Sequence, residues 1–260
     1  MTDLEREYSP SSRVGGDAGP FVASYEARSA VARRTLGARV IRLEGGSLAV
    51  SAGEGAPVLV FIHGGYWQAL SAEASLYLAP AALALGWSYA AVEYTLAPAA
   101  DLATMVRQCS SALTAVEASL GDGPMVVAGH SAGAHLAAMT TLAEISPVAV
   151  ARTVLVSGVF DLRPIVHTTV NDPLGLDRAA AEAISPMLLP VSAHHEVTVA
   201  WGDNETDAFK AQGSSYAARL RHAGLEVAAF ECSGRHHFDI VDDLVDPATE
   251  LGAFTVGGLR

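Results

Sequence analysis

The chain contains 260 residues, half of them hydrophobic and 17% of them charged, which is enough apolar material for one large folded domain. Its formal net charge is −12 at pH 7, and it contains no long basic block. Because nucleic acids and anionic membranes attract basic surfaces, we expect neither of them as a partner.

Residues 1–7 are charged and contain no apolar stretch, so the sequence predicts no signal peptide, and no apolar run is long enough to span a membrane. The two cysteines, Cys109 and Cys232, lie far apart and outside any Cys-x-x-Cys motif. This pattern predicts neither a disulfide framework nor a zinc site, and it is typical of reducing compartments. We therefore expect a cytoplasmic protein without a bound metal.

Hydrophobic periodicity and turn residues predict an alternation of strands and helices. In chain order the predicted elements are an extended arm over 1–20, a helix over 21–36, a hairpin of strands 39–43 and 47–51, a strand over 58–62, a helix over 77–86 interrupted at Pro80, a strand over 88–94, a helix over 101–120, strands over 125–129, 153–158 and 197–201, a helix over 206–223, a strand over 226–231 and a helix over 237–244.

This alternation predicts an α/β fold, with a mostly parallel central sheet and helices on both faces. We expect a single domain over 1–260, in which residues 1–36 form an N-terminal arm and helix. Residues 159–195 contain four prolines and only one short helical piece, 178–184. An insertion of this kind between a strand and the next helix predicts a small lid over a site at the carboxyl ends of the strands.

A Gly-x-Ser-x-Gly motif surrounds Ser131, between a short apolar run and an alanine-rich segment. In a strand–turn–helix context the sharp chain reversal puts the serine hydroxyl over the edge of the sheet, and the two glycines avoid collisions with neighbouring backbone. Ser131 is therefore the candidate nucleophile. Taken alone, the motif also fits a turn of small residues with an incidental serine.

The segment His-Gly-Gly-Tyr-Trp at 63–67 follows the strand predicted over 58–62. A glycine pair at this place lets backbone N–H groups approach a substrate oxygen closely, so Gly64, Gly65 and the N–H of Ala132 are candidates for an oxyanion hole. Tyr66 and Trp67 are candidates for substrate binding, although both could instead pack against the lid.

The loop after Trp201 carries the carboxylates of Asp203, Glu205 and Asp207, where a triad acid is expected after the nucleophile in chain order. The Gly-x-x-acid spacing from Gly202 favours Glu205, and Asp203 remains the alternative. Asp161, after the preceding strand, is a more distant candidate.

A histidine pair, His236 and His237, follows the last predicted strand and completes the order serine, acid, histidine. His237, directly before the predicted final helix, is the candidate general base, and His236 is its alternative. Such a base takes the proton of the serine and later returns it to the leaving group, while the carboxylate fixes its tautomer.

From about Arg39 to Leu244 the chain resembles the α/β-hydrolase superfamily on these motifs. Within it, the His-Gly-Gly-x-Trp sequence at 63–67 resembles the oxyanion motif of the kynurenine formamidases, or arylformamidases. Three further segments are similar to that family: 8–12, the acid loop with Phe209 and Gln212 after it, and 237–241. The family acid is often Asp where this chain has Glu205.

The resemblance implies hydrolysis of N-formylkynurenine to kynurenine and formate, a step of tryptophan breakdown, by Ser131, an acid and His237 without a cofactor. A carboxylesterase of small acyl esters, or a hydrolase of a secondary-metabolite amide or ester, is the alternative that uses the same residues. A non-catalytic binding protein of the same fold is disfavoured because the serine, the histidine and the glycines are all present. The expected partner is a small-molecule substrate, and a homodimer remains open.

Overall fold

The computed structural model describes residues 2–143 and 146–259, and Met1, Glu144, Ile145 and Arg260 lie outside the described residues. Eight strands form one sheet in the order β1-β2-β4-β3-β5-β6-β7-β8. The strands are β1 (Ile41–Arg42), β2 (Leu48–Val50), β3 (Val58–Ile62), β4 (Ser88–Val92), β5 (Met125–His130), β6 (Arg152–Val156), β7 (Glu196–Asn204) and β8 (Val227–His236).

The sheet is parallel from β4 through β8, and the pairings of β1 with β2 and of β2 with β4 are antiparallel. All five residues of β3 and all six of β5 are buried. Strands covered on both faces are apolar throughout, which is why these runs lack alternation. The mostly parallel sheet that the sequence predicts is confirmed.

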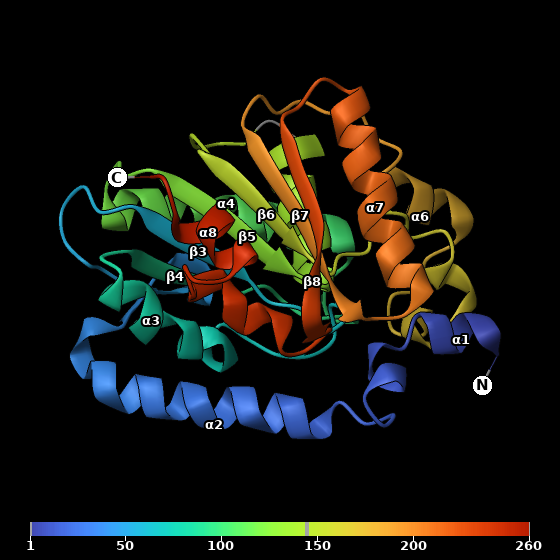
Figure 1. Ribbon diagram of the computed structural model, residues 1–260, viewed down its shortest axis with the longest axis horizontal. Coiled ribbons are helices and arrows are strands. Elements are labelled where there is room, and N and C mark those ends of the chain that lie inside the picture. Colours follow the sequence, from blue (N-terminus) through green and yellow to red (C-terminus); the bar gives the residue numbers. More distant parts are fainter. Residues whose placement is uncertain (1, 144–145, 260) are drawn as a thin grey trace.

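Helices cover both faces of the sheet (Figure 1). The α-helices are α1 (Asp3–Glu7), α2 (Gly19–Leu36), α3 (Ala79–Ala84), α4 (Leu102–Leu120), α5 (Ala132–Ala138), α6 (Arg178–Ala183), α7 (Asp207–His222) and α8 (Glu250–Val256). One apolar core joins the sheet to α4, α5 and α7, and a second core joins the opposite face to α2, α3 and α8. In the described part of the chain, no helix combines the length and apolarity that a membrane span requires.

The N-terminal segment differs from the extended arm expected over 1–20. Residues 3–7 form α1, whose first turn is capped by the side chain of Thr2, and residues 10–13 form a 3₁₀ turn. Helices this short are marginal by themselves, so their formation depends on tertiary contacts that a sequence pattern does not reveal. Figure 1 shows α1 beside the first turn of α7, where the two helices are in contact.

Two helix predictions also need correction. The segment expected as a helix broken at Pro80 is a 3₁₀ helix over Glu73–Leu78 followed by α3, with Pro80 in the first turn of α3, where a missing N–H costs little. The helix expected over 237–244 is a 3₁₀ helix over Ile240–Val245. The apolar spacing of this segment suits a repeat of three residues per turn as well as 3.6. His237 therefore lies in a turn, directly after β8.

Candidate active site

Ser131 lies in the sharp turn between β5 and α5, with φ 56° and ψ −120°. Its backbone N–H donates to the carbonyl oxygen of Val156 over 2.8 Å. A Cβ on Gly133 would lie 2.0 Å from the carbonyl oxygen of Ile62, and one on Gly129 would lie 2.2 Å from that of Gly133. Both positions therefore require glycine, because any side chain would overlap backbone atoms of β3 or α5.

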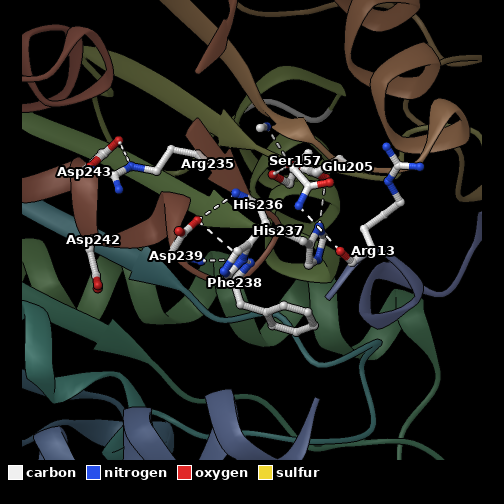
Figure 2. Close-up of polar contacts among 12 residues, drawn as sticks. Arg13, Ser157, Glu205, Arg235, His236, His237, Phe238, Asp239, Asp242 and Asp243 are labelled. Carbon is white, nitrogen blue, oxygen red and sulfur yellow. Dashed lines mark hydrogen bonds and ion pairs between the residues drawn. The ribbon is translucent and has the colours of Figure 1, made fainter. Parts of the chain in front are cut away.

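The side chains of His237 and Glu205 lie buried and close together, with His237 directly after β8 and Glu205 directly after β7 (Figure 2). The Nδ1 atom of His237 lies 2.9 Å from Oε2 of Glu205, and the two residues are 3% and 2% exposed. A carboxylate only accepts, so Nδ1 carries the proton and Nε2 is the free acceptor when the ring is neutral. This is the tautomer that a general base requires.

The second oxygen of Glu205 is held by Ser157 and Gly202. The Ser157 hydroxyl donates to Oε1 over 2.5 Å, and the Gly202 N–H donates to it over 2.7 Å. Burial by itself raises the pKa of Glu205, but His237 and these two donors outweigh it, so the pKa lies below its usual value. Sequence reasoning missed Ser157, a residue after β6 with φ 51°, which directs its hydroxyl to the acid.

The other candidate acids have different partners. Asp203 accepts from the backbone N–H of Gly234 over 2.8 Å, within the β7–β8 pair. Asp161 is paired with Arg163 over 2.6 Å, and Asp207 is in the first turn of α7. His236, the alternative base, accepts at Nδ1 from the N–H of Phe238 over 3.1 Å and lies beside Asp239 (Figure 2). The structure therefore brings Glu205 to His237, and not the alternatives.

The glycine loop after β3 passes directly over Ser131. A Cβ added to Gly64 would lie 3.0 Å from that of Ser131, and one added to Gly65, at φ 93°, would lie 2.3 Å from the carbonyl oxygen of Ala69. Ala132 begins α5, so its N–H is among those without a partner inside the helix. Gly64 therefore lies against Ser131, Gly65 lines the same cavity as Ser131, and Ala132 follows Ser131 directly in the chain.

Tyr66 and Trp67 occupy different environments. Tyr66 lines the cavity over Ser131, and its hydroxyl donates to the carbonyl oxygen of Tyr8 over 2.6 Å. Trp67 is completely buried, and its ring lies perpendicular to that of His135 with a centroid distance of 5.2 Å. The expectation that Trp67 lines the pocket is therefore not met, since its indole belongs to the apolar core beneath the loop.

A cavity of about 360 Å³ opens over Ser131 and His237. Its walls come from the glycine loop, from residues 168–170 and, against expectation, from the N-terminal segment. The only sequence signal for this role was the similarity of residues 8–12 to the formamidase family. The residues from outside the motifs that line the cavity are Glu5, Tyr8, Ser9, Pro10, Ser11, Ala18, Val22, Tyr25, Ala69, Leu70, Thr168, Thr169, Val170 and Phe238.

Residues 59–239 match the family model described as the alpha/beta hydrolase fold. The chain belongs to the α/β-hydrolase fold family. Kynurenine formamidase from Danio rerio is 37% identical to it over 73% of this chain and 68% of the relative, and the Drosophila melanogaster enzyme of the same name is 28% identical over 76% and 72%.

Among solved structures, a candidate thioesterase from a Silicibacter species has a TM-score of 0.87 and 30% identity, covering 97% of this chain and 98% of that one. A hyperthermophilic esterase from Pyrobaculum calidifontis has a TM-score of 0.66 and 22% identity, covering 93% and 91%, and this similarity concerns the fold. The family and these relatives identify the chain as an enzyme, a hydrolase. The expected resemblance to kynurenine formamidase is confirmed.

His130 of this hydrolase precedes Ser131 and contacts the turn that carries His237. Its Nε2 atom lies 2.7 Å from the carbonyl oxygen of His237, so Nε2 carries the proton and donates. Burial, followed by the neighbouring His237, lowers the pKa of His130 well below its usual value, which keeps the ring neutral. No sequence pattern distinguishes this histidine from the other eight.

The segment 159–195 contributes Thr168, Thr169 and Val170 to the cavity of the hydrolase. The Gln68 amide, beside the glycine loop, donates to the carbonyl oxygen of Val170 over 2.8 Å. Asn171, a polar residue of the expected lid, instead closes a turn, since its side chain bonds both the N–H and the carbonyl oxygen of Leu176. Only a short part of the insertion therefore faces Ser131.

Proposed function

We propose that this hydrolase cleaves aryl formamides, with N-formyl-L-kynurenine as substrate and L-kynurenine and formate as products. The observation that carries the proposal is the convergence of Ser131, the His237–Glu205 pair and the glycine loop on one apolar-walled cavity. Similarity to relatives named kynurenine formamidase supports the choice of acyl group.

In the proposed reaction, Nε2 of His237 takes the proton of Ser131 as the serine oxygen attacks the formyl carbon. Negative charge then moves to the formyl oxygen, where the N–H groups of Gly64, Gly65 and Ala132 are proposed to stabilise it. Donors of this kind favour the transition state because the charge exists only there. Glu205 holds the imidazole in its tautomer and stabilises the imidazolium.

The C–N bond breaks when His237 passes its proton to the departing aryl amine. The serine is left as its formyl ester. A water molecule, deprotonated by His237, attacks this ester, and its cleavage releases formate and restores the serine hydroxyl. An aryl amine leaves more easily than an alkyl amine, so residues suited to ester hydrolysis also suit this amide. No step needs a metal or an organic cofactor.

A carboxylesterase of small acyl esters is the second candidate. Solved structures named as esterases share the fold, and an esterase from Mycobacterium tuberculosis is 26% identical over 72% of this chain and 52% of its own length. The proposed residues would serve an ester in the same way, so only the relative rates decide between the two candidates.

The deciding experiment measures kcat/KM for N-formylkynurenine and for p-nitrophenyl acetate, with Ser131→Ala as the blank. We expect turnover of both to depend on Ser131 and the formamide to be strongly preferred. Equal or better turnover of the ester would replace the formamidase proposal with the esterase. Turnover that persists in Ser131→Ala would remove Ser131 as the nucleophile.

We also propose that residues 1–260 form one hydrolase domain in which 159–195 is an insertion. Support comes from the single sheet, whose strands span Ile41 to His236, and from the two cores that share it. Limited proteolysis tests the organisation. Nicks confined to 159–195, with the resulting pieces still associated, are expected, and cleavage into two folded pieces that separate in solution would contradict it.

A further inference from the structure

Glu5 is the only acidic or basic side chain, apart from the two histidines, among the described residues that line the cavity over Ser131. No lysine or arginine is present there to receive an anionic group of a substrate. Several hydroxyls on the walls already donate hydrogen bonds within the chain. The Tyr66 hydroxyl donates to the carbonyl oxygen of Tyr8, and the Tyr25 hydroxyl donates to that of Phe238. The Thr168 hydroxyl donates to the carbonyl oxygen of Ile165, and the Thr169 hydroxyl donates to the Glu5 carboxylate.

Two donors from the lid fix the Glu5 carboxylate in place. The N–H of Thr169 donates to Oε1 over 2.8 Å, and the hydroxyl of Thr169 donates to the same oxygen. Among the described residues, no hydrogen bond ends on Oε2 of Glu5. These bonds also lower the pKa of Glu5, so the group is an anion at neutral pH.

The short helix that carries Glu5 is tied to the body of the enzyme on its other side. The Thr206 hydroxyl donates to the carbonyl oxygen of Glu7 over 2.6 Å, and the Ala208 N–H donates to the Glu7 carboxylate over 3.0 Å. The Gln212 amide donates to the Tyr8 hydroxyl over 3.0 Å. The carboxylate therefore belongs to an ordered wall of the cavity.

Aromatic rings form much of the wall that shares the cavity with Glu5. They are those of Tyr8, Tyr25, Tyr66 and Phe238. Aromatic faces attract cations through their quadrupole and repel carboxylates, and this electrostatic attraction is absent for a neutral group of the same shape. An anion beside aromatic rings, with no basic side chain, is the chemistry that recognises an ammonium group.

We propose that Glu5 makes this cavity select substrates whose leaving group carries a cationic centre, over neutral isosteres and against carboxylates. The inference rests on the proposed catalytic role of the cavity. For N-formylkynurenine it assigns the α-ammonium to Glu5 and leaves the α-carboxylate toward solvent, because the described walls offer that carboxylate no cation.

The test compares 3-(trimethylammonio)formanilide with 3-tert-butylformanilide, two substrates of the same shape that differ in charge. The ratio of their kcat/KM values in the wild type is divided by the ratio in Glu5→Gln, which cancels the intrinsic reactivity of each leaving group. Glu5→Gln keeps a carbonyl oxygen for Thr169 and removes the charge. Asp3→Asn is the matched control, since Asp3 is an exposed acid of the same helix, paired with Arg6 and absent from the cavity wall.

We expect the cationic preference to fall roughly two- to fivefold in Glu5→Gln, through KM, as for a partly exposed charge pair. Asp3→Asn should change it less than twofold. Equal ratios in the wild type and Glu5→Gln, or equal changes in both variants, would overturn the proposal, because the preference would then come from the general negative field of the enzyme.

Two further measurements separate this inference from the proposed function. The same pair of groups on phenyl acetates reports charge selection during ester cleavage, and equilibrium binding of the formanilides to Ser131→Ala reports it without turnover. If the formanilides are not cleaved but Glu5 still governs charge selection in ester cleavage or in binding, the inference is supported and the formamidase proposal fails. Rapid formanilide cleavage with no effect of Glu5 on either ratio would do the reverse.

Discussion

The Nε2 atom of His130 donates to the backbone carbonyl oxygen of His237 over 2.7 Å, which links the residue before the proposed nucleophile to the turn that carries the proposed base. The two imidazole rings lie 4.8 Å apart, centroid to centroid. This bond acts on the backbone of His237, and the Glu205 carboxylate acts on its side chain. Together they restrain both ends of the residue that has to move a proton.

Replacing His130 tests this restraint. We expect His130→Phe to lower kcat roughly tenfold to a hundredfold at nearly constant KM, because small displacements of a catalytic group are costly. His130→Gln, whose amide can still donate to the carbonyl oxygen, should recover most of the rate. A pH profile of kcat for both variants provides the check, and identical losses in Phe and Gln would show that the hydrogen bond is unimportant.

The assignment of the acid is tested by a pair of substitutions. Glu205→Gln should reduce kcat by roughly 10²- to 10⁴-fold, since the amide no longer fixes the tautomer of His237 or stabilises its charge. Asp203→Asn should change kcat less than twofold, because Asp203 accepts from the N–H of Gly234 in β8, whereas His237 is bonded to Glu205. Steady-state kinetics of the two purified variants decide the matter, and the opposite ranking would move the acid to Asp203.

The turn around Ser131 predicts a large cost for a single methyl group. In Gly133→Ala the new Cβ would meet the carbonyl oxygen of Ile62 at 2.0 Å, so we expect a loss of several kcal/mol in the free energy of unfolding, about what overpacking costs at its upper end. Gly224→Ala is the control, since its site has φ 92° but nothing within 4 Å, and backbone strain alone costs about 1 kcal/mol. Urea unfolding measures both, and equal losses would contradict the steric argument.

Stability should fall as the solution becomes acidic. Burial lowers the pKa of His63 and of His135 to about 4, so below pH 6.5 the unfolded chain binds protons that the folded chain refuses. Each group therefore removes on the order of 2 kcal/mol between pH 7 and pH 5. The lowered pKa of Glu205 also makes the folded state less stable in acid, because folding favours the ionised carboxylate and this stabilisation is lost as the pH falls through the pKa of Glu205 in the folded state.

Urea unfolding at pH 7 and pH 5 measures this dependence. In His135→Gln the amide can replace Nε2 as the donor to the carbonyl oxygen of Ile184, a bond of 2.8 Å in the wild type. This variant should show a shallower decline with acid. A decline as steep as that of the wild type would mean that His135 does not carry the effect.

The sequence by itself determined the fold class and the chain order of the candidate groups. Buried strands are continuous apolar runs that can be recognised in the sequence. The turn around Ser131 requires glycine at 129 and 133 for steric reasons, so both features can be predicted from short stretches of sequence. Because parallel strands end at the same edge, the residues after β3, β5, β7 and β8 were also expected to meet.

Only the tertiary structure decided which of several neighbouring side chains reach Ser131 and His237. Asp203 and Glu205 are two residues apart: Asp203 lies inside β7, at the irregular pairing with β8 between Gly202 and Asn204, and Glu205 follows the last residue of β7. The Trp67 side chain lies in the core, whereas the neighbouring Tyr66 lines the cavity. The wall built from α1 is fixed by contacts with residues some 200 positions away, such as Glu7 with Thr206 and Ala208, and no local pattern encodes contacts at that separation.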